Sequence, residues 1–205
     1  MKRALSGLAA LVAALAITAG CGNSSGRDQG GMDHGGTAHG APTAAATAGA
    51  THNAADVTFA QMMIVHHRQA VDMAMLAPTR AGSPEVGQLA ARIEAAQGPE
   101  IETMTAWLRA WGATPAPTAG MDHGGMGHGS MPGMMTTEDM ARLRAARGAE
   151  FDRLFLTMMI KHHEGAVAMA KTVLEDGASR DAGTVARSII TSQSAEIGEM
   201  KAMLG

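Results

Sequence analysis

Apolar residues recur every three or four positions in two long segments of the chain, residues 61–75 and 157–171. That spacing is typical of one buried face of an α-helix. Two further segments, residues 93–108 and 189–204, have the same periodicity, whereas no stretch alternates apolar and polar residues as a half-buried strand does. The pattern therefore predicts an all-α protein built on four long helices.

The four helices belong to two copies of one unit, displaced by 96 residues. QMMIVHHRQAVDMAM in the first copy corresponds to TMMIKHHEGAVAMAK in the second, and no gap interrupts the match over about fifty residues. Each copy predicts a two-helix hairpin, hairpin one over residues 54–112 and hairpin two over residues 137–205. Two hairpins bury their apolar faces most simply as a four-helix bundle.

Residues that cap or interrupt helices predict the boundaries in hairpin one. Asn53 or Asp56 can cap the first helix, and Pro78 is expected to end it. Ser83, followed by a proline, predicts the start of the second helix, because serine caps helices and proline suits the first helical position. Pro99 lies inside that helix and predicts a kink.

In hairpin two, Gly177 predicts the end of the first long helix, and Ser179 or Asp181 predicts the start of the next. An extra short helix is expected from Thr137 to Arg147, because threonine followed by two acidic residues is typical of a helix start. The predicted fold is thus a four-helix bundle with one short additional helix.

The two copies agree on one side of their first helix and differ on the other. Met63, Ala70 and Ala74 lie at the centre of the shared side, and His66 and His67 flank that centre. The shared side is the one predicted to be buried. The differing positions are Gln61/Thr157, Val65/Lys161, Arg68/Glu164, Gln69/Gly165, Asp72/Ala168 and Met75/Lys171.

Thioethers and imidazoles line up along the shared side. Met62, His66 and Met73 follow one another at i, i+4 and i+11. Their counterparts in the second copy are Met158, His162 and Met169. Thioethers favour Cu(I), and imidazole binds Cu(I), Cu(II) or zinc. The pattern predicts a copper site, with Cu(I) preferred over Cu(II); the alternative is that these residues only fill the core.

Polar residues also occupy the apolar face of the second helix in each hairpin. Gln97 and Glu100 share that face with Met104, and the counterparts of the three are Gln193, Glu196 and Met200. A buried carboxylate needs a cation or a donor, so Glu100 is expected to contact a histidine and to orient it. His67 and His163 are therefore either metal ligands or hydrogen-bond partners of these carboxylates. Whether the hairpins share one site or hold two stays open.

The stretch between the hairpins, residues 113–136, is rich in glycine, methionine and histidine. Because nothing is expected to pack against it, its donors predict metal capture; drift of low-complexity sequence is the alternative. The donors are Met121, His123, Met126, His128, Met131, Met134 and Met135.

The chain begins with a short basic stretch and an apolar run that ends in Thr-Ala-Gly before Cys21. This is typical of a lipoprotein signal peptide over residues 1–20, with Cys21 as the lipidated first residue of the mature chain. An ordinary secretory signal or an uncleaved anchor is the alternative. Residues 21–53 predict a disordered tether to the bundle domain, residues 54–205. The protein is therefore expected at the outer face of the cytoplasmic membrane, in the periplasm or at the cell surface.

Several functions are not expected. A net charge of −3 provides no basic stripe for nucleic acid. The chain has no Glu-x-x-His pair for a di-iron oxidase and no evident nucleophile with a base, so an enzyme is not predicted. The alternative function is a bundle without metal, whose methionine-rich face binds a protein partner or an apolar ligand.

The segments FAQMMIVHHRQAVDMAML and GAEFDRLFLTMMIKHHEGAVAMAK, each followed by a helix with Gln-x-x-Glu-Ile-x-x-Met, resemble the domain-of-unknown-function 305 family. The resemblance covers residues 56–204 and implies a ferritin-like helical bundle. Copper-binding proteins of the CopM type belong to that family, which implies copper as the ligand and a copper-handling protein as a partner. The metal ligands that it implies are Met62, Met63, His66, His67 and Met73, with Met158, Met159, His162, His163 and Met169.

Overall fold

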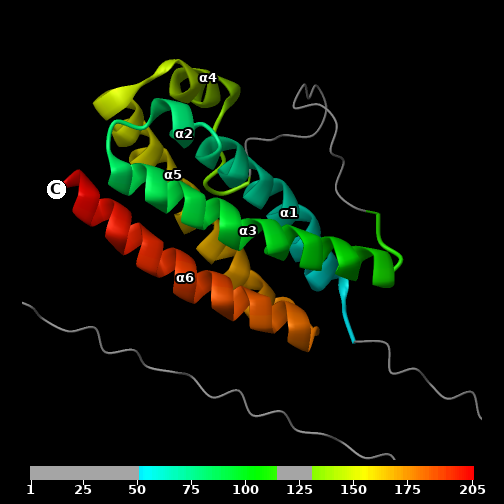
Figure 1. The fold of residues 1–205 in the computed structure, drawn as a ribbon. Coiled ribbons are helices and arrows are strands. Elements are labelled where there is room, and N and C mark those ends of the chain that lie inside the picture. Colours follow the sequence, from blue (N-terminus) through cyan, green and yellow to red (C-terminus); the bar gives the residue numbers. More distant parts are fainter. Residues whose placement is uncertain (1–50, 115–130) are drawn as a thin grey trace, which may run out of the picture. The chain divides into compact units, whose positions relative to one another are not determined.

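The computed structural model describes residues 51–114 and 131–205, which fold into six α-helices (Figure 1). The helices are α1 (Ala54–Ala74), α2 (Ala77–Arg80), α3 (Pro84–Ala110), α4 (Thr137–Ala145), α5 (Gly148–Asp176) and α6 (Arg180–Leu204). The predicted all-α bundle of two hairpins with a short extra helix is confirmed. The signal peptide, Cys21 and most of the tether lie outside the described residues, and none of the described helices is long and apolar enough to cross a membrane.

Each hairpin packs its two long helices together, α1 on α3 and α5 on α6, and α1 and α5 join the hairpins (Figure 1). Helices α1 and α5 run in opposite directions. At one end, the side-chain amide of Asn53 donates to the carbonyl of Asp176 at 2.7 Å. At the other end, Ala81 pairs with Gly148 through a single backbone bridge. The hairpins are therefore related by an approximate two-fold axis through the α1–α5 crossing.

The helices begin where the capping residues predict. Asn53 caps α1 and Asp56 completes the capping box, so both candidates contribute. Ser83 caps α3 and Ser179 caps α6. The side chain of Thr136 caps α4, and its backbone amide donates to the side chain of Asp139, which completes a second capping box. These side chains satisfy backbone amides that have no partner within the helix.

The predicted end of the first helix is wrong by a few residues. Helix α1 stops at Ala74, and Pro78 lies inside the separate helix α2. In hairpin two the equivalent position is Leu174, and α5 continues through it to Asp176. A proline at 78 lacks the amide that would bond to the carbonyl of Ala74, so the helix restarts instead of continuing. Pro99, in contrast, is accommodated inside the continuous helix α3.

Two apolar clusters fill the bundle, one on each side of the α1–α5 crossing. One contains Ala70, Met73, Leu89, Ile93, Phe151, Phe155 and Met159. The other contains Phe59, Met63, Met104, Leu108, Ala166, Val173 and Ile189. Along each long helix, the change from one cluster to the other falls at polar residues. This polar layer consists of His66, His67, Gln97, Glu100, His162, His163, Gln193 and Glu196.

Two aspartates join each hairpin to the loop of the other. Asp56 is fully buried, and its Oδ2 accepts from the backbone amides of Ala178 and Ser179 at 2.9 and 3.0 Å. Asp152, at the equivalent position, accepts from the amide of Gly82 at 2.9 Å. Each hairpin loop therefore depends on the opposite hairpin for a hydrogen-bond acceptor.

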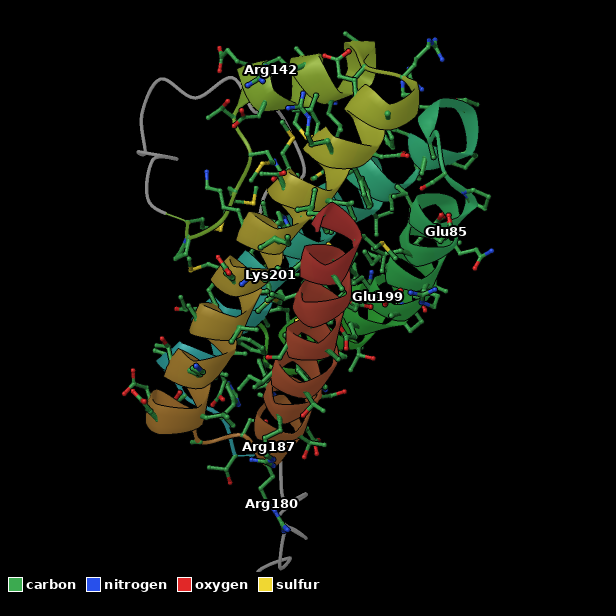
Figure 2. The ribbon with its side chains drawn as sticks, turned by 90° about the vertical axis from the view of Figure 1, so that its left-hand side faces the viewer. Glu85, Arg142, Arg180, Arg187, Glu199 and Lys201 are labelled. Carbon is green, nitrogen blue, oxygen red and sulfur yellow. The ribbon has the colours of Figure 1, made fainter. Side chains whose placement is uncertain are left out.

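The exposed side of α6 forms ion pairs with both neighbours (Figure 2). Glu199 pairs with Arg92 of α3, which lies in the other hairpin. Lys201 pairs with Glu164 of α5 at 3.2 Å. All four side chains are largely exposed, so these pairs orient α6 more than they stabilise it.

Candidate functional site

Four histidines meet at the crossing of α1 and α5, and none of them exposes more than 1% of its surface. His66 of α1 and His162 of α5 form the histidine pair, with ring centroids 3.7 Å apart and ring planes inclined by 38°. His67 and His163 are the residues that follow them in each helix. The hairpins thus bring their predicted ligands to one shared position on the approximate two-fold axis.

His67 and His163 each contact the glutamate of their own hairpin. Nε2 of His67 lies 2.7 Å from Oε2 of Glu100, and Nε2 of His163 lies 2.7 Å from Oε2 of Glu196. The expected contact between a carboxylate in the seam and a histidine is therefore present in both copies. An ionised carboxylate only accepts, so Nε2 of each histidine donates the proton in these contacts.

His66 makes a different contact. Its Nε2 lies 3.1 Å from the carbonyl oxygen of Pro132, which belongs to the stretch between the hairpins. His162, at the equivalent position, forms no well-aligned hydrogen bond through either ring nitrogen, and only the backbone carbonyl of His66 interacts weakly with its ring. Nδ1 of all four histidines is buried without a partner. The polar layer therefore holds several ring nitrogens that form no hydrogen bond with the protein.

The histidine pair is uncharged at neutral pH. Burial lowers the pKa of His66 from 6.5 to about 3, and the neighbouring His67 adds to the effect, while the bond to Pro132 opposes it. Burial also lowers the pKa of His162 well below its usual value, and His66 and His163 add to the effect. A neutral imidazole is the form that binds metal ions.

Residues 131–135 form a docked segment that lies against both α1 and α5. The side chain of Gln69 accepts from the backbone amide of Met135 at 2.7 Å and donates to its carbonyl at 3.0 Å. On the other side, Gly165 lies directly against Pro132 and Gly133, where a methyl group would overlap the carbonyl of Pro132. Gly133 has φ of +81°, a conformation that glycine adopts without strain.

The expectation that nothing packs against this part of the linker is therefore wrong. Met135 is 6% exposed and belongs to an apolar cluster, and Met131 and Met134 are half-buried. Gln69 and Gly165 are buried although they lie on the differing side of the helices, because the docked segment covers them. Met121, His123, Met126 and His128 lie outside the described residues.

The predicted methionines are divided between the two apolar clusters that flank the polar layer. Met73, Met158, Met159 and Met200 lie in one apolar cluster. Met63 and Met104 lie in the other, with Met169 packed against it, and Met62 is half-buried. The thioethers therefore lie on both sides of the polar layer that contains the histidine pair.

Within residues 51–114 and 131–205, no three His, Cys, Asp or Glu side chains are grouped so that they could hold a metal ion. A tetrahedral zinc site or a di-iron carboxylate site requires such a group. The donors at hand are two facing imidazoles and neighbouring thioethers, a set that suits a soft ion of low coordination number. Gln97 and Gln193 add carbonyl oxygens without partners to the same layer.

Sequence reasoning found the four histidines, both glutamates and both glutamines of this layer. It missed Pro132, Gln69 and Gly165, which act through the docked segment. The one available signal was the difference between Gln69 and Gly165 at equivalent positions, which marks a place where the two hairpins meet different neighbours.

The chain matches the family described as domain of unknown function (DUF305) over residues 56–204. It superimposes with a TM-score of 0.66 on a DUF305 fragment from Deinococcus radiodurans, which is 33% identical over 75% of this chain and 97% of that one. A DUF305 protein from Streptomyces coelicolor gives a TM-score of 0.63 at 33% identity, over 73% and 90% of the two chains.

CopM in its Cu(II)-bound form is 37% identical, over 72% of this chain and 94% of CopM, with a TM-score of 0.62. CopM has also been solved in Cu(I)-bound, silver-bound and apo forms. None of the curated proteins compared with the chain matches it. The ferritin-like bundle implied by the resemblance is confirmed. The match over residues 56–204, together with these structures, shows that the protein belongs to the DUF305 family.

Proposed function

We propose that this protein binds copper outside the cytoplasm, with the histidine pair of His66 and His162 as the central donors and nearby methionine thioethers as additional ligands. One observation supports the proposal above all. Two neutral imidazoles face each other in the core with ring centroids 3.7 Å apart, and most of their nitrogens form no hydrogen bond with the protein. In this proposal the protein is a carrier or store of copper and not an enzyme.

The energetic cost of the polar layer supports a ligand. A buried polar atom without a partner costs about 1–3 kcal/mol. Histidine packs no better than leucine or phenylalanine at such positions. If its role were purely structural, no other interaction would offset the energetic cost of burying its unpaired nitrogens. A metal ion that accepts the lone pairs would offset it, and the carboxylates of Glu100 and Glu196 would hold the neighbouring imidazoles in one tautomer.

The choice of metal follows from the donors. Thioethers and imidazoles favour Cu(I), and imidazoles alone also accept Cu(II). CopM, a relative at 34–37% identity, has been solved with Cu(I), Cu(II) and silver, which supports copper as the ion here. The preference for Cu(I) rests on the methionines around the polar layer and on the linker donors Met121, His123, Met126 and His128.

Export is part of the proposal. The relative from Streptomyces coelicolor is described as a secreted protein, and the first residues of this chain have the features of a lipoprotein signal. With Cys21 lipidated, the bundle would sit at the outer face of the cytoplasmic membrane. There it would sequester copper or pass it to a copper-handling partner protein.

The test is a titration of the purified protein with Ag(I), and with Cu(I) under reducing conditions. Because a ligand that binds only the folded state stabilises it, a hundredfold excess of free ion over the Kd should add about 2.7 kcal/mol to the free energy of unfolding. The double variant His66→Leu with His162→Leu should lose one site from the stoichiometry together with this stabilisation. Substitution of His52, an exposed histidine on the tether side, is the matched control and should lose neither.

A second variant in which Met121, His123, Met126 and His128 are replaced by serine separates linker binding from bundle binding. It should keep the site that depends on the histidine pair. The proposal is wrong for the bundle if the double histidine variant retains the full stoichiometry and the full shift in melting temperature.

The alternative function requires a methionine-rich face open to a partner. The predicted face is buried between α1 and α5, and the docked segment covers its outer edge. Met135 and Met158 line the open cavity of about 410 Å³ beside α4, but so do Arg142, which Figure 2 labels, Arg153 and Lys161. No observation in the described residues therefore favours this alternative.

A further inference from the structure

Equivalent positions of the two hairpins hold the docked segment from opposite sides. Gln69 binds both backbone groups of Met135, whereas Gly165 provides the space in which Pro132 and Gly133 approach the backbone of α5. Both residues are buried, with Gln69 at 1% exposure. Neither a glycine nor an amide that is already satisfied can bind copper, so their role concerns the segment they hold.

The segment determines which nitrogen of His66 is free. A carbonyl oxygen has no proton to donate, so the contact of 3.1 Å with Pro132 requires a proton on Nε2 of His66. The lone pair then lies on Nδ1, which is buried and has no partner. His162 has no contact of this length, and only the backbone carbonyl of His66 interacts weakly with its ring, so its tautomer is held less firmly.

We propose that residues 131–135 are a clamp that holds His66 as its Nε2–H tautomer, so that Nδ1 is the nitrogen offered to the metal, and that Gln69 and Gly165 are the positioning residues of this clamp. The inference rests on the proposed function for the identity of the metal. Its structural half, the tautomer and its dependence on Gln69 and Gly165, concerns the protein without metal.

The clamp makes the two members of the histidine pair unequal. A carbonyl that accepts from the second nitrogen of a metal-binding histidine fixes the ring orientation and makes the other nitrogen a better donor. With the clamp in place, an ion would meet a fixed donor on His66 and an adjustable donor on His162. Such an arrangement retains the ion through one hairpin while the other adapts to its coordination geometry.

The experiment uses the full-length protein labelled with ¹⁵N at histidine. Long-range ¹H–¹⁵N spectra of the protein without metal should show His66 as the Nε2–H tautomer in the wild type. Addition of Ag(I) should shift the Nδ1 resonance of His66 and leave its Nε2 resonance in the protonated range. Binding through Nε2 of His66 would overturn the proposal.

Two variants release the clamp. Gly165→Ala places a methyl group against the carbonyl of Pro132, and Gln69→Met keeps the length of the side chain but removes both bonds to Met135. Both should lose the single tautomer at His66 and should release Ag(I) or Cu(I) faster, with affinity lower by about 10–100-fold. Gly198→Ala is the matched control, because a methyl group there meets no other atom, and it should change neither quantity.

The outcomes distinguish the two proposals. If Gly165→Ala does not fold, Gln69→Met decides, since it introduces no overlap. A wild type that binds no Ag(I) at the histidine pair contradicts the proposed function, while the tautomer of His66 in the metal-free variants still tests the clamp. Variants that fold, keep the Nε2–H tautomer and release the ion at the wild-type rate show that Gln69 and Gly165 do not position His66.

Discussion

Hairpin one and hairpin two carry the same polar side chains at the same depth but meet different neighbours. The contacts His67–Glu100 and His163–Glu196 have the same length of 2.7 Å, and Gln97 and Gln193 are equally buried. The hairpins differ where the docked segment, which lies outside the repeat and has no second copy, contacts them. The docked segment lies against Gln69 on one side and Gly165 on the other.

This comparison separates what duplication preserves from what it allows to change. Residues that face the approximate two-fold axis must satisfy their own counterparts, so a change in one copy requires a matching change in the other. Residues under the docked segment have no counterpart to contact, and they differ between the copies, glutamine at 69 and glycine at 165. The asymmetry of the site thus originates in the linker and not in the hairpins themselves.

Acid should weaken the shared layer of both hairpins, and this is the largest effect that we expect. The pKa of His66 is about 3 in the folded protein and 6.5 in the unfolded chain, and the pKa of His162 is lowered in the same sense. The unfolded state therefore binds more protons, so stability is fully present above pH 6.5 and falls as the pH is lowered toward 3. At about 1.4 kcal/mol per pH unit, His66 alone should account for a loss of roughly 2–3 kcal/mol between pH 6.5 and about pH 4.5, and His162 should add a loss in the same direction.

Urea unfolding of the metal-free protein at both pH values measures this loss. His162→Leu should remove the part of the loss that His162 causes, because one of the two lowered pKa values disappears. A variant with the same acid sensitivity as the wild type would show that the histidine pair does not cause the loss.

Substitution of the two equivalent aspartates, Asp56 and Asp152, should destabilise the protein to different extents. Asp56→Ala removes the acceptor of two loop amides in addition to its role in the capping box, whereas Asp152→Ala removes the acceptor of one amide. We expect losses in the free energy of unfolding of about 3–4 kcal/mol for Asp56→Ala and about 1–2 kcal/mol for Asp152→Ala. Chemical denaturation compares them, and equal losses would contradict the structural difference.

Pro99 offers a way to make hairpin one resemble hairpin two. The equivalent residue is Ala195, and Pro99 is exposed, so Pro99→Ala restores a backbone amide without disturbing the core. The free energy of unfolding should rise by about 1–2 kcal/mol, somewhat less than the full cost of proline in a helix interior. Thermal unfolding followed by circular dichroism would detect the gain. A decrease would mean that the shape imposed by Pro99 is needed for packing.

The smallest effect concerns an ion pair that only hairpin two has. Lys201 contacts Glu164 at 3.2 Å, whereas the equivalent residues of hairpin one are Thr105 and Arg68. Because both side chains are more than half exposed, Lys201→Thr should lower the free energy of unfolding by less than about 0.5 kcal/mol. A loss above 1 kcal/mol in denaturant titrations would show that the pair has a larger role than its exposure indicates.

Much of the fold could be predicted from sequence because its determinants are local. Helical periodicity, capping residues and a 96-residue repeat define four long helices and their pairing. The contact between Glu100 and His67 was also accessible, since a carboxylate in an apolar seam must find a donor. The end of α1 was harder to predict from the sequence, because a proline such as Pro78 can either stop a helix or begin a new one.

The arrangement at the centre of the site could not be predicted in the same way. Which histidine of each helix faces the other hairpin depends on how α1 and α5 cross, and the repeat is the same for any crossing. The burial of Gln69 depends on Met135, which is 66 residues away in a segment with no apolar periodicity of its own. Such contacts arise from the assembled fold and leave no periodic signal.

The exchange of loop contacts through Asp56 and Asp152 has a consequence for the origin of this chain. Each hairpin contains a loop whose backbone amides lack an acceptor and an aspartate that can accept from such a loop. Two identical hairpins can therefore satisfy each other's loops. An isolated half of this protein is therefore built to form a two-fold symmetric homodimer, with its histidines meeting on the symmetry axis. The 96-residue repeat indicates duplication and fusion of such a hairpin, and the stretch that connects the two copies has no counterpart related by the two-fold axis.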